Sequence, residues 1–161
     1  MKTILLSGAL LLLASCSTTN YYVVRHAEKA PSDGAMTSDV PLSAEGEKRA
    51  MALSGALHSK KIAHIYATPY KRTQGTAQHL SQVLGVPIQT YDPRDASFVQ
   101  KLKTQQKNIL VVGHSNTVDD IVNGLTGESL LKDLPETQYG DLFIVKKKGG
   151  KYSLQQKRFG Q

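Results

Sequence analysis

Two histidines and two arginines stand where apolar runs of the chain end. Arg25 and His26 follow the apolar pair Val23–Val24, His114 follows the run "NILVVG", and Arg72 comes shortly after the run "IAHIYAT". The arginine fork matches two phosphate oxygens at once, and an imidazole nitrogen can attack phosphorus and form a covalent intermediate. Because phosphoryl transfer depends mainly on positioning and on neutralising charge, these residue types predict a phosphate-handling site that needs no metal ion.

The hydrophobic pattern predicts an alternation of strands and helices that could position these residues. The predicted strands are residues 21–24, 62–68, 87–91 and 108–113, and the predicted helices are residues 43–59, 69–84, 96–106 and 117–125. Two further strands flank Gly149–Gly150 as an antiparallel hairpin. We therefore predict an α/β fold, a three-layer α/β/α sandwich whose mostly parallel central sheet has an antiparallel C-terminal edge.

The predicted sheet brings these residues to one edge. In an open parallel sheet, ligands bind outside the carboxyl ends of the strands. The pair Arg25–His26 and the residue His114 follow such ends directly, and Arg72 lies on the first turn of a helix. The helix after His114 starts near "SNT", where free backbone N–H groups also favour an anion. Ser115 and Asn116 could contact the phosphate there or cap the helix.

Four segments resemble one known family, in order along the chain. They are "RHAEK" at Arg25–Lys29, "PLSAEGEKRA" at Pro41–Ala50, "TPYKRTQGTA" at Thr68–Ala77 and "VVGHSNTV" at Val111–Val118. With these motifs the chain resembles the histidine phosphatase, or phosphoglycerate mutase-like, superfamily. The resemblance implies a phosphoglycerate mutase-like fold and a phosphorylated nucleophile at His26. It also implies that Arg25, Arg72 and His114 bind the phosphoryl group, with no cofactor and no metal ion.

The chain departs from the family pattern at the residue that would protonate the leaving group. One branch of the family carries an aspartate directly after the second histidine, where this chain has Ser115. The other branch carries a glutamate past the third strand, where this chain has "YDPRDAS". Spacing favours Asp95 as the acid, with Asp92 as an alternative. Glu28 is a further alternative, although it could instead orient an arginine, and a good leaving group would need no acid.

The N-terminal residues predict export and lipid attachment. The apolar run Ile4–Leu13 follows a lysine and is too short to cross a bilayer comfortably. The tetrapeptide "LASC" then resembles the lipobox of bacterial lipoproteins, whose cysteine is lipidated and becomes the new N-terminus. We therefore predict a lipoprotein signal peptide at residues 1–15, lipid on Cys16, a tether at 16–20 and the phosphatase domain at 21–161. A plain secretory signal is the alternative.

Such a leader would place the protein in the bacterial cell envelope, on the periplasmic side, at the outer rather than the inner membrane. The single cysteine excludes an internal disulfide, and 161 residues indicate one domain. The formal charge of +7 suits phosphorylated ligands or anionic headgroups, and export makes nucleic acid the weakest partner class. The lysine run Lys146–Lys148 is interpreted as a solvated hairpin end, with headgroup contact as the less favoured alternative.

Two functions fit these residues. The favoured hypothesis is a monomeric, metal-independent phosphatase that hydrolyses phosphomonoesters, or a phosphate on a larger envelope molecule, through a phosphohistidine on His26. The alternative is a non-catalytic envelope lipoprotein that binds phosphorylated ligands through Arg25, Arg72 and His114. Turnover of an aryl phosphate would separate the two.

Overall fold

One mixed sheet forms the centre of the molecule in the computed structural model, which describes residues 18–32 and 39–160. Its strands are β1 (Thr18–Arg25), β2 (Ile62–Ala67), β3 (Ile88–Thr90), β4 (Asn108–Gly113), β5 (Asp141–Lys148) and β6 (Lys151–Arg158). Their order is β3-β2-β4-β1-β5-β6. The first four strands are parallel, whereas β5 pairs antiparallel with β1 and β6 antiparallel with β5. The predicted sheet, with its antiparallel C-terminal edge, is confirmed.

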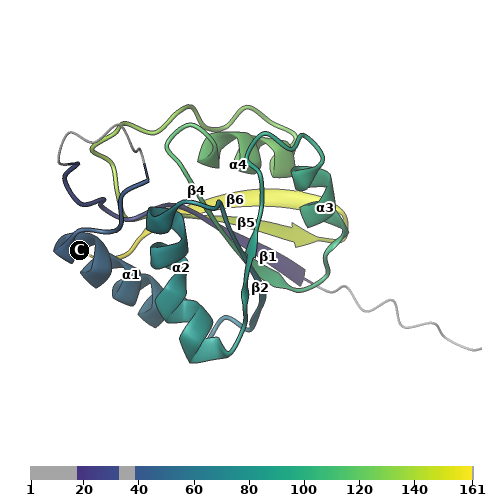
Figure 1. Cartoon of the computed structure of the whole chain (residues 1–161). Helices are drawn as coiled ribbons and strands as arrows, with labels where there is room; N and C mark the ends of the chain where they lie inside the picture. Colours follow the sequence, from purple (N-terminus) through teal and green to yellow (C-terminus); the bar gives the residue numbers. More distant parts are fainter. Residues whose placement is uncertain (1–17, 33–38, 161) are drawn as a thin grey trace, which may run out of the picture.

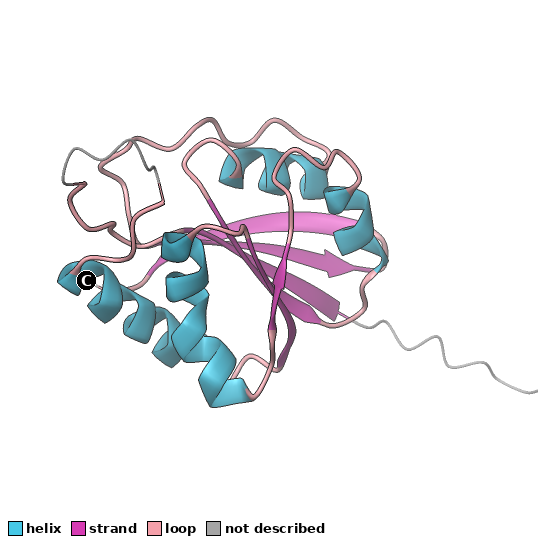
Figure 2. Ribbon diagram, in the orientation of Figure 1, coloured by secondary structure: helices cyan, strands magenta, loops and turns pink. Residues whose placement is uncertain are grey.

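Helices cover both faces of the sheet and give the molecule three layers (Figures 1 and 2). On one face lie α1 (Ala44–Leu57) and α2 (Lys71–Leu84), and on the other lie α3 (Phe98–Thr104) and α4 (Val118–Thr126). Each face has its own apolar cluster, which the strands share by alternation. The predicted sandwich is therefore confirmed.

The central strands explain why charged groups appear where they do. In β1, Tyr21 and Val23 pack into the cluster under α3 and α4, while Tyr22 and Val24 pack into the cluster under α1 and α2. A strand buried on both faces must be apolar along its length. Charged side chains can follow only where the buried part of the strand ends, and in β1 the first of them is Arg25.

Most predicted element boundaries differ from the structure by one to three residues. β1 begins at Thr18, so residues 18–20 belong to the sheet and not to the predicted tether. These polar residues pair only with β5, which means that backbone pairing and not apolar burial defines this part of the strand. The prediction that Pro69 lies in the first turn of a helix is wrong by two residues. The helix α2 begins at Lys71, with its first backbone hydrogen bonds accepted by the Tyr70 carbonyl.

The predicted signal peptide and the predicted lipid site Cys16 lie outside the described residues. Within residues 18–32 and 39–160, no helix has the length and apolar character needed to cross a bilayer.

Candidate active site

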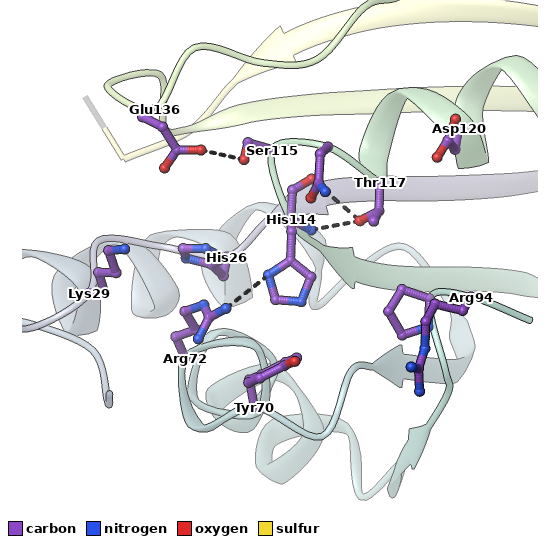
Figure 3. A pocket seen from close by; sticks show the side chains of 12 residues that line it. His26, Lys29, Tyr70, Arg72, Arg94, His114, Ser115, Thr117, Asp120 and Glu136 are labelled. Carbon is purple, nitrogen blue, oxygen red and sulfur yellow. Dashed lines mark hydrogen bonds between the residues drawn. The ribbon is translucent and has the colours of Figure 1, made fainter. Parts of the chain in front are cut away.

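A cleft opens at the carboxyl ends of the parallel strands (Figure 3). Its volume is about 530 Å³, and it is open to solvent. The structure brings five of the predicted site residues to its lining: His26, Arg72, His114, Ser115 and Asn116. Tyr70, Arg94, Asp120 and Glu136, which the sequence did not single out, line it as well. The predicted convergence at this edge therefore occurs in the structure.

The backbone around His26 is held on both sides. The His26 N–H donates to the carbonyl of Gly113 at 2.9 Å, which extends the pairing of β1 with β4 by one residue. The Ala27 N–H donates to the hydroxyl of Thr76 on α2, also at 2.9 Å. His26 itself is only 4% exposed. A sheet strand and a helix thus fix the position of this imidazole from opposite directions.

One hydrogen bond decides the tautomer of His26. Its Nδ1 lies 2.8 Å from the carbonyl oxygen of Ala27. Because a carbonyl oxygen can only accept, Nδ1 must carry the proton, and the lone pair is left on Nε2. Burial lowers the pKa of His26 to about 3, and the positive charges of Arg25 and Arg72 act in the same direction. His26 is therefore a neutral imidazole at ordinary pH, with a nucleophilic Nε2.

His114 is oriented by a threonine at the end of β2. Its ring centroid lies 5.5 Å from that of His26. The Nη2 atom of Arg72 donates toward Nδ1 of His114 at 3.4 Å, so Nε2 carries the proton and donates to the Thr68 hydroxyl at 2.9 Å. Thr68 is fully buried and also contacts the hydroxyl of Thr73. Burial lowers the pKa of His114 to about 4, with Arg72 as the next cause.

Arg72 lies in the first turn of α2, where its guanidinium reaches over the cleft floor. Its Cζ lies 4.5 Å from the centre of the Tyr70 ring, and the same ring meets His114 edge-on at 5.2 Å. Stacking on an aromatic ring restricts the guanidinium to one plane. A cation and an imidazole therefore lie beside His26 on one side of the cleft.

Arg25 differs from the prediction in where its side chain lies. It does not belong to the cleft lining, and it is 5% exposed. Its Nη1 atom donates to the carbonyls of Pro135 at 2.9 Å and Gln138 at 3.2 Å, and its guanidinium stacks on Tyr139 at 4.4 Å. Within the described part of the chain its buried Nε has no hydrogen-bond partner. The protein therefore uses Arg25 mainly to dock the loop before β5 beside the cleft.

Glu136, on that loop, is the carboxylate that sequence reasoning missed. Its Oε2 accepts from Arg25 Nη2 at 2.7 Å, and its Oε1 accepts from the Ser115 hydroxyl (Figure 3). These two bonds, the one from Ser115 first, hold the pKa of Glu136 below its usual value. The loop is further docked by the Leu134 N–H, which donates to the Ser115 carbonyl at 2.8 Å. An ionised carboxylate is thereby placed on the cleft.

The three carboxylates that were predicted as the acid are all engaged elsewhere. Asp95 accepts from Ser97 and Lys101 at the start of α3, and these contacts lower its pKa to about 2. Asp92 pairs with Arg94, which lowers its pKa as well. None of the three belongs to the cleft lining. Spacing alone pointed to Asp95 because it follows β3, but its side chain turns toward its own helix.

Glu28 orients an arginine, which is the alternative role predicted for it. Both of its carboxylate oxygens accept from Arg49 on α1, at 2.6 to 2.9 Å. The bond to Arg49 lowers the pKa of Glu28 against the opposing effect of burial. The arginine that it orients is therefore Arg49, which also donates to the carbonyl of Gly160 near the C-terminus.

Ser115 and Asn116 do not cap α4. The residue at the cap position is Thr117, whose hydroxyl accepts from the backbone N–H of His114 at 2.9 Å. Ser115 and Asn116 instead line the cleft, and the Ser115 hydroxyl is occupied by Glu136. Among residues 18–32 and 39–160, no group of three or more His, Cys, Asp or Glu side chains is arranged to hold a metal ion.

Comparison with known proteins points to one family. The model of the histidine phosphatase superfamily (branch 1) matches residues 21–93. A protein of Escherichia fergusonii named probable phosphoglycerate mutase GpmB is 32% identical over 121 residues, which covers 69% of this chain and 56% of that protein. Its namesake from Salmonella choleraesuis is 38% identical over 76 residues, or 45% of this chain and 35% of that protein. The matches thus span about a third to just over half of these relatives.

Solved structures share the fold. The protein histidine phosphatase SixA complexed with tungstate gives a TM-score of 0.67 at 19% identity, covering 86% of this chain and 96% of that one. Bacillus stearothermophilus YhfR gives 0.64 at 18% identity, covering 84% and 95%. A mycobacterial glucosyl-3-phosphoglycerate phosphatase gives 0.64 at 12% identity, covering 89% and 99%.

Proposed function

Because this chain belongs to the histidine phosphatase superfamily, we propose that it hydrolyses phosphomonoesters, without a metal ion, through a phosphohistidine intermediate on His26. The observation that carries the proposal is the tautomer of His26. Its Nδ1–H is occupied by the Ala27 carbonyl, so the lone pair of a neutral, buried ring is available at Nε2. A nucleophile in the wrong tautomer, or one that is protonated, could not attack phosphorus.

In the first step, Nε2 of His26 attacks phosphorus and the bond to the leaving oxygen breaks. Arg72, which His114 orients through Nδ1, neutralises charge on the equatorial oxygens, and the bond from Nδ1–H of His26 to Ala27 stabilises the positive charge that grows on the phosphorylated ring. The leaving oxygen departs with the electron pair and takes its proton from solvent. Good leaving groups are therefore the preferred substrates.

In the second step, a water oxygen attacks the phosphohistidine. The phosphorus–nitrogen bond breaks, its electron pair returns to Nε2 of His26, and inorganic phosphate forms. Glu136 accepts the proton of the water, because its lowered pKa keeps it ionised and its two hydrogen bonds hold it on the cleft. Arg25 acts here as a positioning residue, since it holds the loop that carries Glu136.

Hydrolysis is favoured over mutase chemistry by the shape of the site. A mutase must keep water away from its phosphohistidine until the second substrate position is filled. This cleft is open to solvent, and it could also receive a phosphate carried by a larger molecule. We further propose the envelope location that the N-terminal residues predict, with Cys16 as the lipid-bearing residue and a monomer as the active form. Equal retention of the wild-type and Cys16→Ser proteins in a membrane fraction washed with high salt, which screens contacts to headgroups, would contradict the anchor.

The test is a rapid-quench experiment, stopped with alkali, that uses an aryl phosphate and a chelator. The wild-type chain should release phosphate in the presence of chelator and carry acid-labile, base-stable phosphate during turnover. The variant His26→Ala should lose both properties. His79→Ala, which removes an outer histidine of α2 paired with Glu47, serves as the matched control and should keep both. Binding of phosphate without turnover by the wild type would instead identify a non-catalytic binding protein.

A further inference from the structure

We propose that a groove lined by lysines binds the headgroups of anionic phospholipids and holds this protein against a membrane surface. The groove has a volume of about 290 Å³ and crosses β1, β5 and β6. Three lysines line it, Lys60, Lys146 and Lys157, together with the polar residues Asn20, Ser153 and Gln155. No aspartate or glutamate is among its lining residues. The proposal concerns a different surface from the cleft and does not depend on the chemistry of His26.

Strand pairing and one asparagine bring the three lysines together. Lys146 on β5 lies between Asn20 of β1 and Ser153 of β6. Lys157 lies further along β6, and the side chains of alternate residues on that strand share one face. Lys60 follows α1, and its carbonyl accepts from Asn108 Nδ2 at 2.7 Å. Three separate elements therefore deliver positive charge to one groove.

These charges are not balanced within the protein. In the described part of the chain, Lys101 forms an ion pair with Asp95, but none of the three groove lysines forms an ion pair. The three positive charges repel one another, so an anion bound in the groove would reduce this repulsion. Lysine ammonium groups at the end of long, exposed stems can reach a headgroup phosphate without leaving water.

The positive surface continues around the end of the sheet. Lys148 pairs with Thr18, at the point where β1 begins, and Lys151 lies across the hairpin turn from Lys148. On the opposite face, Lys147 donates to the carbonyl of Lys103 at 2.7 Å. Figure 1 shows that β1 starts and β5 ends at the same end of the sheet. Thr18 follows the predicted lipid site Cys16 by two residues, so a lipid there would bring these lysines to a bilayer.

The distribution of charge favours a membrane over a small soluble phosphate. The lysines lie on three elements and on both faces of the sheet end, which suits a surface that presents many phosphates. On β1 the groove is lined by Asn20 and Tyr22, whereas the catalytic cleft lies beyond Arg25, at the carboxyl end of the same strand. A molecule bound through the groove would keep its cleft open to water.

The test is co-sedimentation of the full chain with two kinds of vesicle, phosphatidylcholine alone and phosphatidylcholine with phosphatidylglycerol. The ratio of the two binding constants removes the contribution of the N-terminal segment, which is common to both. The triple variant Lys60→Gln, Lys146→Gln, Lys157→Gln should lose most of the preference for anionic vesicles. Each lysine near the surface contributes about fivefold, so the loss is on the order of 100-fold. Added salt should reduce the wild-type preference by screening.

A matched control removes the same charge elsewhere. The triple variant Lys48→Gln, Lys71→Gln, Lys132→Gln changes three exposed lysines outside the groove and should keep the preference. A charge-conserving variant with arginine at the three groove positions should keep it too, which separates charge from misfolding. Equal losses in the two glutamine variants would overturn the proposal in favour of net charge alone. Release from the vesicles by soluble glycerol phosphate, but not by salt of equal ionic strength, would overturn it in favour of a small-ligand site.

Discussion

At the scale of single residues, the site depends on which ring nitrogen of each histidine carries the proton. His26 presents a bare Nε2 because its Nδ1–H faces the Ala27 carbonyl, whereas His114 presents Nδ1 to Arg72 because its Nε2–H faces Thr68. Two imidazoles with opposite tautomers can take different roles, one as nucleophile and one as the acceptor that orients Arg72. Burial lowers the pKa of both rings and keeps them neutral.

Thr68 tests this arrangement without touching the reacting atoms. The change Thr68→Val keeps the shape of the buried side chain but removes the acceptor for His114 Nε2–H. Losing one hydrogen bond of this kind should lower kcat/KM about tenfold, because His114 can then rotate and no longer orients Arg72. Steady-state rates with an aryl phosphate measure the effect. Thr126→Val removes a hydroxyl at the far end of α4 and should leave the rates unchanged.

Glu136 tests the second step separately from the first. If its carboxylate accepts the proton of the attacking water, Glu136→Gln should slow dephosphorylation by about 10²–10⁴-fold and leave phosphorylation of His26 almost unchanged. With a good leaving group, the variant should show a burst of one product per enzyme and then accumulate phosphohistidine. Asp120→Asn, on the far side of the same cleft, is the control and should show no burst. Absence of a burst in Glu136→Gln would remove the carboxylate from the mechanism.

At the scale of secondary-structure elements, α1 packs closely against the segment that follows His26. A Cβ atom on Gly46 would overlap the Glu28 carbonyl oxygen, and that carbonyl already accepts from the Ser43 N–H at 2.9 Å. Ser43 caps the same helix through the Gly46 N–H. The start of α1 and the chain after His26 are therefore one packed unit, and the glycine permits their contact.

Two glycines of α1 should respond in opposite ways to the same change. Gly46→Ala forces the Glu28 carbonyl away and should lower the free energy of unfolding by about 1–3 kcal/mol. Gly55→Ala meets nothing within 4 Å on the same helix and should raise it by about 0.5–1 kcal/mol. Urea unfolding measures both. A neutral Gly46→Ala would mean that the segment after His26 moves freely, contrary to the packing described.

At the scale of the whole molecule, the two buried histidines couple stability to pH. Their pKa values, about 3 for His26 and about 4 for His114, lie below the usual 6.5 that each regains on unfolding. Between these values the unfolded chain binds more protons than the folded one. The stabilisation is therefore present above about pH 6.5 and is lost as the pH falls toward the folded-state values.

This linkage predicts that the free energy of unfolding falls steeply as the pH drops below about 6.5. For each pH unit below 6.5, each histidine should lower the free energy of unfolding by up to about 1.4 kcal/mol. Urea unfolding at about pH 7 and pH 5 measures the slope, and the double variant His26→Asn, His114→Asn should flatten it. If the wild type and the double variant lose the same free energy over this range, other groups govern the acid limb.

The sequence by itself determined the elements and five residues of the cleft lining. Strands such as β4 are apolar throughout because both faces are buried, and that pattern is visible without any structure. His26, Arg72 and His114 could be placed because each follows a strand or starts a helix at one edge of a parallel sheet. Local patterns of this kind specify local structure, and the sheet topology then brings the residues together.

Only the tertiary structure decided the rest. Glu136 reaches the cleft because Arg25 and the Ser115 backbone dock the irregular loop before β5, and such a loop carries no periodicity that predicts its path. Asp95, which spacing favoured, turns to its own helix because Ser97 and Lys101 are nearer partners than the phosphate site. The position of Glu136 depends on hydrogen bonds between segments far apart in sequence, whereas Asp95 is held by near neighbours. In both cases side-chain direction, and not spacing, determines which groups meet.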